Sequence, residues 1–283
     1  MGADREHRWL WLILALAFLF RLAPLGRYVT PDEPAWVYRS LRFADALAAR
    51  DWAAVPVTGH PGVTTMWLGA AGIFLRRLLD PATADAHLAW LRPLVWLAPE
   101  NDAAFRHLAY FLPAGRVAVA LTTTLGLAVL YALLTRAFDR RVAFVTVGLL
   151  AGDPFLVGHS GLLHTDALLA TGVVLAFAAA LAALRDRSPV WWAAAGLFTG
   201  LAVLTKTPAM LLVPFVSLLA LLGSVRDRSP AVLLLFAVAA AAPLLLYPPV
   251  WAAPGDTLAV LLSFAGKHVE TVQRPIFFAR RMT

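Results

Sequence analysis

Seven apolar segments separated by short connections limit the possible folds of this chain more than any other feature. The hydrocarbon core of a bilayer is about 30 Å thick, so a helix that crosses it needs about 20 apolar residues. The segments cover Trp9–Leu25, Pro113–Leu134, Val142–Gly158, Asp166–Leu184, Val190–Thr205, Pro208–Leu222 and Ala231–Trp251. The sequence therefore predicts an all-α polytopic membrane protein with about seven transmembrane helices, built as one domain over residues 1–283.

The composition excludes the other broad classes of protein. Hydrophobic residues make up 60% of the chain and charged residues 14%, whereas soluble domains contain about 45–50% and about 25%. Disordered chains have the opposite bias, with few apolar residues and many charges. The absence of cysteine excludes a disulfide-stapled secreted domain.

Arginine clusters in the short connections indicate the topology. They comprise Arg5 and Arg8; Arg136, Arg140 and Arg141; Arg185 and Arg187; and Arg226 and Arg228. If all seven segments cross the membrane, these clusters lie on one side, which the positive-inside rule makes cytoplasmic. We therefore read the net charge of +7 as a topology signal and expect no nucleic-acid partner.

The first segment has no small-residue cleavage site after it, so we expect an uncleaved helix with a cytoplasmic N-terminus. Arg21 near its outer end is expected to snorkel to the interface. Residues 26–112 then form a long first outer loop with two interfacial helices, Ala35–Arg50 and Val63–Leu79. Residues 252–283 are expected to begin a later outer loop. The expected location is a bacterial plasma membrane.

The motif Pro31-Asp32-Glu33-Pro34 directly follows the first helix. Thr30-x-x-Glu33 has the capping-box spacing, and Asp32 alone could also be an N-cap. A carboxylate in either position can still offer an oxygen to a ligand. The sequence leaves open whether these two acids start a helix, carry chemistry or do both.

Asp166 is a second acid at the outer side, where it either caps a helix together with Thr165 or serves function, since ionisable groups at membrane depth are costly. Asp153 before Pro154 is interpreted as a residue associated with a helix kink or with a polar network, and not as a catalytic acid. The outer cations are His60, Lys206, Lys267 and His268. Lys206 either snorkels or binds phosphate as a point charge. His159, His164 and His268 could ligate a metal, but their spacing is not diagnostic.

Taken in order, these motifs resemble the membrane glycosyltransferases of the GT-C fold. The resemblance is carried by Asp32-Glu33, by the segment from His60 to Trp67, by Asp166, by Gly200–Lys206, by Tyr247–Trp251 and by Gly266–Glu270. It is nearest to glycosyltransferase family 39, the protein O-mannosyltransferases, and to the aminoarabinose transferases. His60 stands where the latter often carry Lys, and Asp153 where relatives often carry a small residue. Relatives also continue with further helices, so we expect the C-terminal part of the family fold to be missing here.

The resemblance implies a hexosyl- or pentosyltransferase that takes its sugar from a polyprenyl phosphate outside the cell. The acceptor would be a protein hydroxyl, a lipid or a glycan, and membrane lipids surround the protein. Asp32 would be the general base of an inverting transfer, with Glu33 and Asp166 as further catalytic acids. His60, Lys206 and Lys267 would bind the donor phosphate. A divalent metal could take part, with Glu33 and His268 as candidate ligands.

Two other classes stay open from sequence. A transporter or lipid flippase would show internal repeats and helices broken at the midplane, and neither is clear here. A non-catalytic scaffold would not require acids and cations that converge on one face.

Overall fold

The computed structural model describes residues 3–94, 103–270, 276–277 and 280–281, and most of them are helical. The helices that form a bundle are α1 (Ala3–Arg21), α5 (Ala104–Ala137), α6 (Arg140–Gly152), α7 (Pro154–Ser160), α8 (Asp166–Asp186), α9 (Pro189–Thr205), η2 (Thr207–Leu211), α10 (Leu212–Asp227) and α11 (Ala231–Leu246). The helices beyond it are α2 (Glu33–Ala49), η1 (Trp52–Ala54), α3 (Val63–Leu79), α4 (Pro81–Leu91), α12 (Pro249–Ala252) and α13 (Pro254–Glu270). The two-residue strands β1 (Ile276–Phe277) and β2 (Arg280–Arg281) pair antiparallel.

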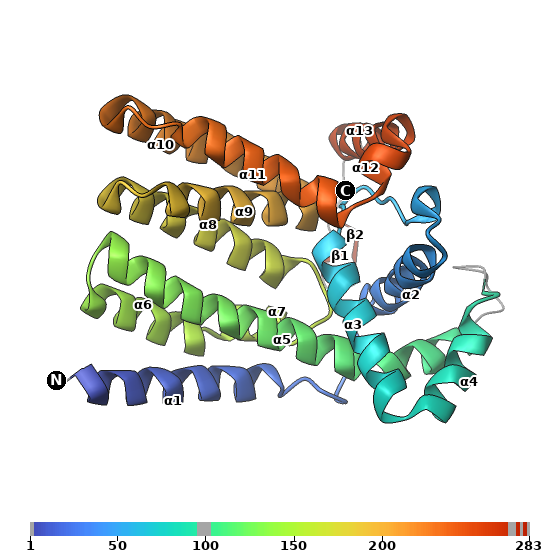
Figure 1. The fold of residues 1–283 in the computed structure, drawn as a ribbon. Helices are drawn as coiled ribbons and strands as arrows, with labels where there is room; N and C mark the ends of the chain where they lie inside the picture. The colour runs from blue at the N-terminus through green and yellow to red at the C-terminus, as the bar shows by residue number, and fades with distance from the viewer. Residues whose placement is uncertain (1–2, 95–102, 271–275, 278–279, 282–283) are drawn as a thin grey trace.

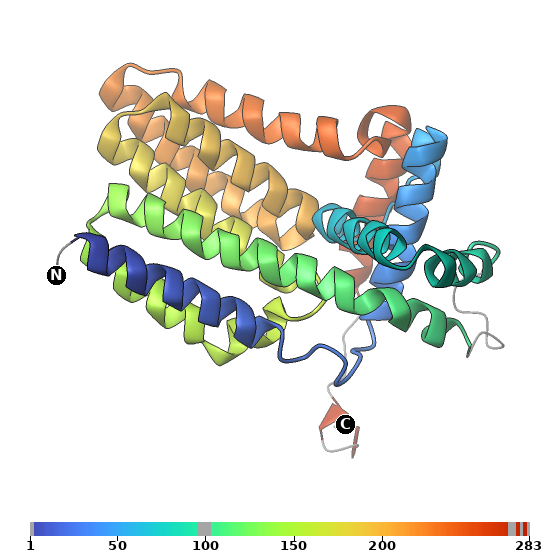
Figure 2. The ribbon, with the colours of Figure 1, turned by 60° about the horizontal axis from the view of Figure 1, so that its bottom comes forward.

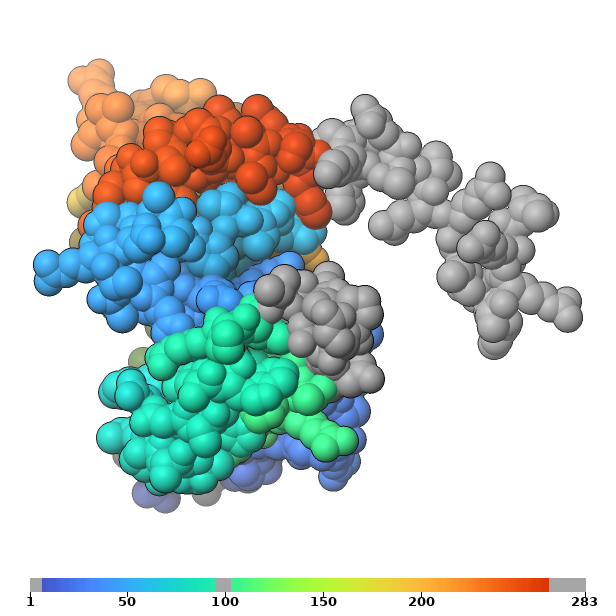
Figure 3. All heavy atoms as spheres, turned by 90° about the vertical axis from the view of Figure 1, so that its right-hand side faces the viewer, coloured from blue at the N-terminus to red at the C-terminus, as the bar shows by residue number. Residues whose placement is uncertain are grey.

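The bundle helices run side by side, while α2, α3, α4, α12 and α13 gather at one end (Figures 1 and 2). The N-terminus and the α5–α6, α8–α9 and α10–α11 connections lie at the opposite end. The three described arginine clusters between helices occupy these connections, so they share one end of the bundle as the sequence predicts. Figure 3 looks onto the other end, which α2 to α4 and α13 cover.

Helix length and composition agree with a polytopic membrane protein. Among the described residues, Ala104–Ala137, Asp166–Asp186 and Thr207–Asp227 are long and apolar enough to cross a bilayer. Arg140–Gly152 and Pro154–Ser160 add a fourth span if the bent pair counts as one. Pro189–Thr205 and Ala231–Leu246 are apolar but shorter. The all-α membrane class is confirmed, and the count of seven spans stays a prediction.

Small residues bring the central helices close together. A Cβ on Gly196 would lie 2.5 Å from the Leu235 carbonyl oxygen, and one on Gly200 would lie 2.6 Å from that of Ala239. The two glycines are four residues apart, so they share the face of α9 that packs on α11. Close backbone approach through small residues is a common way for helices to associate in membranes, where the hydrophobic effect does not drive them together.

The bounds of the outer helices largely agree with the sequence expectations, and their placement in the membrane interface stays a prediction. Val63–Leu79 begins and ends as predicted, and α2 covers Glu33–Ala49 instead of Ala35–Arg50. Its apolar stripe is buried, with Trp36 at 4% and Phe43 at 0% exposure. Helix α4 is not predicted from the sequence. Asp80 caps its start by accepting a hydrogen bond from the Thr83 amide.

Two polar residues of the bundle, Asp153 and Arg21, have different outcomes relative to the sequence predictions. The third segment breaks at Asp153 with a bend of 65° between α6 and α7. Asp153 caps α7 through its contact with the Leu156 amide, which agrees with a kink-associated role. The snorkelling prediction for Arg21 is wrong, because its side chain is only 1% exposed. It turns inward and donates to the carbonyls of Ala17 and Ala151, at the ends of α1 and α6.

Candidate active site

The predicted acids and cations meet where the loops at the α2 end of the bundle converge. The loop between α1 and α2 contributes Asp32, the loop between α7 and α8 contributes His164, the first residue of α8 is Asp166, and the turn between α9 and η2 contributes Lys206. These residues are separated by up to 174 positions in the chain. The arrangement of the helices therefore brings these four residues together.

Asp32 occupies the N-cap position of α2, but its side chain makes no capping hydrogen bond. The carboxylate is 74% exposed, and Oδ2 lies 3.3 Å from His164 Nε2. Because the carboxylate is not used to hold the helix end, its oxygens remain accessible to a ligand from outside. Asp32 thus occupies the N-cap position, but its side chain does not act as a cap.

His164 connects Asp32 to the other acid and to the lysine. Its Nδ1 lies 3.3 Å from Asp166 Oδ2, and Asp166 Oδ1 lies 2.6 Å from Lys206 Nζ. The four side chains form a continuous row, which we call the Asp32–Lys206 row. A neutral imidazole donates to one carboxylate, whereas a protonated ring donates to both. The imidazole therefore connects an exposed carboxylate with a half-buried one.

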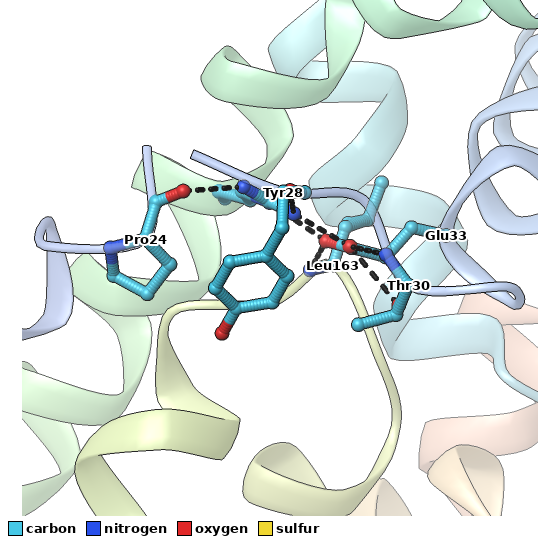
Figure 4. A network of polar contacts seen from close by, with 6 residues as sticks. Pro24, Tyr28, Thr30, Glu33 and Leu163 are labelled. Atoms are coloured by element: carbon cyan, nitrogen blue, oxygen red, sulfur yellow. Dashed lines mark hydrogen bonds and ion pairs between the residues drawn. The ribbon is translucent and has the colours of Figure 1, made fainter. Parts of the chain in front are cut away.

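Glu33 has a different environment, although it is the next residue. It is fully buried, and Arg116 holds both of its oxygens, with Nε 2.7 Å from Oε1 and Nη2 2.6 Å from Oε2. The Leu163 amide donates to Oε1, and the Thr30 amide and hydroxyl donate to Oε2. Figure 4 shows this network around the carboxylate. Only one half of the capping box forms: the Thr30 amide donates to the Glu33 carboxylate, but the helix begins at Glu33 with Asp32 as its N-cap.

Burial alone would raise the pKa of Glu33. The Arg116 hydrogen bonds, assisted by the Thr30 and Leu163 amides, outweigh burial and hold the pKa below its usual range. Arg116 also donates to the carbonyls of Pro24 and Tyr28. Glu33 therefore ties the α1–α2 loop, α5 and the loop before α8 together. Its oxygens are all occupied by protein donors, which favours a structural role over a catalytic or metal-binding one.

The loop that carries His60 docks on the turn that carries Lys206. The Gly62 amide donates to the Thr205 carbonyl at 3.0 Å, and the Thr207 hydroxyl donates to the Gly59 carbonyl at 2.8 Å. His60 packs edge-on against Phe264 at 4.6 Å. The two cations predicted to bind donor phosphate thus lie on adjoining loops.

Lys267 and His268 have side chains outside the described part of the chain. Over the residues that the structure does describe, no group of three or more His, Asp or Glu is arranged to hold a metal ion. The metal prediction therefore remains a prediction.

An apolar groove begins beside the row and runs along the bundle. It has a volume of about 370 Å³. Thr64 and Thr205 lie at its outer end, where their hydroxyls are 2.7 Å apart, and Leu175 and Val129 lie deeper. Thr205 precedes Lys206 directly, so the groove and the ammonium group are neighbours. Such a groove fits an apolar chain whose charged head lies near Lys206.

Residues 112–247 match the family model described as dolichyl-phosphate-mannose-protein mannosyltransferase. The likeness to GT-C glycosyltransferases is confirmed. The match covers 136 of the 283 residues and supports a membrane glycosyltransferase of the kind that uses a sugar on a polyprenyl phosphate, over the transporter and scaffold alternatives. No curated protein and no solved structure matches the chain.

The match includes Arg116, His164, Asp166 and Lys206 and lies downstream of Asp32 and His60. The sequence analysis does not single out Arg116, and it gives His164 only as one of three possible metal ligands. An arginine inside an apolar span is a functional signal, and Arg116 sits in such a span. His164 carried no comparable signal, because its role depends on two carboxylates that the fold brings to its ring.

Proposed function

We propose that the protein transfers a sugar from a polyprenyl phosphate to an external acceptor, either a protein hydroxyl or a lipid or glycan, with Asp32 as general base and inversion at the anomeric carbon. The observation that carries the proposal is the exposed carboxylate of Asp32, which does not cap α2 and stands at the head of a row that ends in Lys206 beside an apolar groove. This arrangement separates a base for the acceptor from a cation for the leaving group.

Asp32 would remove the proton from the acceptor while the acceptor oxygen or nitrogen attacks the anomeric carbon. The bond between that carbon and the phosphate oxygen breaks, and its electron pair stays on the leaving lipid phosphate. Glu33 is a positioning residue in this proposal, because its buried contacts fix the backbone next to the base. A base held in a fixed geometry contributes about 10²–10⁴-fold to the rate.

Lys206 would stabilise the charge that develops on the leaving phosphate. Its side chain is 21% exposed and is already oriented by Asp166. Because Asp166 pairs with Lys206, this acid would position the cation instead of acting as the base. His60 lies on the adjoining loop, where a second positive charge would reinforce the phosphate site. The isoprenoid chain would lie in the apolar groove.

Asp32→Asn tests the base. The amide preserves size and the uncapped N-cap geometry but removes the basic oxygen, so we expect normal folding and a loss of transfer of at least about 100-fold. The measurement is sugar transfer from polyprenyl-phosphate mannose and polyprenyl-phosphate aminoarabinose to a hydroxyl acceptor by the purified protein.

Asp85→Asn is the matched control, because Asp85 is also exposed and contacts a cation, Arg77, at 2.7 Å away from the row. Its transfer rate should equal that of the parent. Near-normal transfer by well-folded Asp32→Asn protein would refute the assignment, and Asp166 would become the leading candidate for the base.

A further inference from the structure

Arg21 is a buried cation that the Asp32–Lys206 row does not use. It is 1% exposed, at the end of α1. Its Nη1 donates to the Ala17 and Ala151 carbonyls, but over the described residues its Nε and Nη2 have no hydrogen-bond partner. A guanidinium remains charged in proteins, and a buried charge without a partner is strongly unfavourable.

Arg116 shows which partner would fit that free edge. Its Nε and Nη2 each donate to one oxygen of the Glu33 carboxylate, at 2.7 and 2.6 Å. The same two nitrogens of Arg21 are the ones without a partner. A bidentate fork of this kind suits the paired oxygens of a carboxylate or a phosphate. The two arginines thus differ: the fork of Arg116 is occupied by a carboxylate, whereas the same two nitrogens of Arg21 are buried without a partner among the described residues.

Arg21 also lines a separate cavity of about 160 Å³ between α1, α5, α6, α7 and α8. Arg21 is the one charged residue among the described residues that line this cavity. Thr123 and Thr171 contribute hydroxyls, and the other lining residues are apolar or glycine. The ligand must therefore be mainly apolar with one anionic group.

The cavity opens on the side of the bundle. Ala170 and Val174 on its rim are exposed, Val174 by 42%. Leu149 and Phe155, which precede lining residues in the chain, are 71% and 74% exposed. In a membrane-spanning bundle such an apolar flank contacts lipid, so a membrane lipid can reach Arg21 without passing through water.

From these observations we propose that Arg21 and its cavity form a binding site for an anionic phospholipid, held through the two free oxygens of its phosphate. The acyl chains would lie along the apolar flank. The site adjoins the apolar groove, and Gly126, Thr171 and Leu175 contribute to both. A Cβ on Gly126 would lie 2.5 Å from Thr171, so α5 and α8 touch between the two spaces.

The test measures lipid retention by the purified full chain, using native mass spectrometry during titration with phosphatidylglycerol or phosphatidylcholine. The parent should retain one phosphatidylglycerol, with at least about 10-fold preference over phosphatidylcholine, because the choline ammonium would place a second positive charge beside the buried guanidinium. Arg21→Gln should weaken phosphatidylglycerol retention at least about 10-fold, and Arg21→Lys should weaken it less because the charge remains. Arg8→Gln, an exposed position on the same helix, should retain lipid like the parent.

A second variant keeps Arg21 and its two backbone contacts, in case Arg21→Gln folds poorly. Ala170→Phe fills the rim of the cavity and should abolish the phosphatidylglycerol preference, while the exposed control Leu149→Phe should preserve it. Unchanged retention in both Arg21→Gln and Ala170→Phe would overturn the proposal. Displacement of the lipid by millimolar inorganic phosphate would also overturn it, because the site would then bind a free anion. Neither result depends on sugar transfer.

Discussion

Asp32 and Glu33 are adjacent in the chain but have opposite environments. The first side chain is 74% exposed and the second is 0% exposed. Consecutive residues at a helix start point in different directions, so one acid can face outward while the next enters the core. This division explains why the motif needs two acids: one is available for chemistry, and the other fixes the loops around it.

Glu33→Gln should destabilise the protein by about 3–5 kcal/mol, because removing one partner of a buried ion pair leaves the other charge uncompensated. Thermal unfolding of the purified protein measures the loss. Asp45→Asn is the control, since its pair with Arg92 is exposed, and such pairs contribute about 0–1 kcal/mol. Equal effects of the two substitutions would contradict the structural role of Glu33.

The same pair predicts a pH dependence. Because the pKa of Glu33 is lowered in the folded protein, its contribution is complete above the ordinary carboxyl pKa of about 4.3 and is lost as pH falls through the folded value. The stability difference between the parent and Glu33→Gln should therefore be constant near neutral pH and shrink in acid. A difference that grows in acid would mean that the pKa of Glu33 is raised.

At the scale of elements, the site depends on how loops dock on helix ends. The loop before α3 reaches the end of α9 through Gly62, whose φ of 62° lies in the left-handed region. A Cβ there would lie 2.1 Å from the ring of Trp36. Glycine is thus required both by the backbone conformation and by the contact with α2.

Gly62→Ala should lower both stability and sugar transfer, because it strains the backbone and displaces Trp36 or the His60 loop. Gly26→Ala is the matched control: Gly26 has a φ of 72° with nothing within 4 Å of an added Cβ. It should cost about 1 kcal/mol for the left-handed backbone, and Gly62→Ala should cost about 1–3 kcal/mol more from overpacking. Equal unfolding temperatures for the two variants would show that the close contact with Trp36 does not affect stability.

At the scale of the whole molecule, the two ends of the bundle have different chemistry. One end carries the arginine clusters, and the other carries the acids, Lys206 and the outer helices. The positive-inside rule assigns the arginine end to the cytoplasm, which would put the Asp32–Lys206 row outside, where a membrane-bound donor meets an external acceptor.

Single cysteines test this orientation, since the chain has no native cysteine. Ala82→Cys should react with a membrane-impermeant thiol reagent in intact cells, whereas Arg140→Cys and Arg187→Cys should react only after the membrane is opened. All three positions are exposed in the structure, so protection would reflect the membrane. Labelling at position 187 in intact cells, or protection at position 82, would show that the proposed topology is wrong.

The sequence by itself determined the helical membrane class, the common end of the arginine clusters and the bounds of Val63–Leu79, because these depend on local apolar length, charge and periodicity. It also marked Asp32, Asp166 and Lys206 as unusual polar groups. Only the tertiary structure decided that Asp32 is exposed while Glu33 is buried, that His164 joins two acids, and that Arg21 turns inward instead of snorkelling. These outcomes depend on which distant backbone and side-chain groups meet, through contacts such as Glu33 with Arg116, and local patterns carry no information about such pairs.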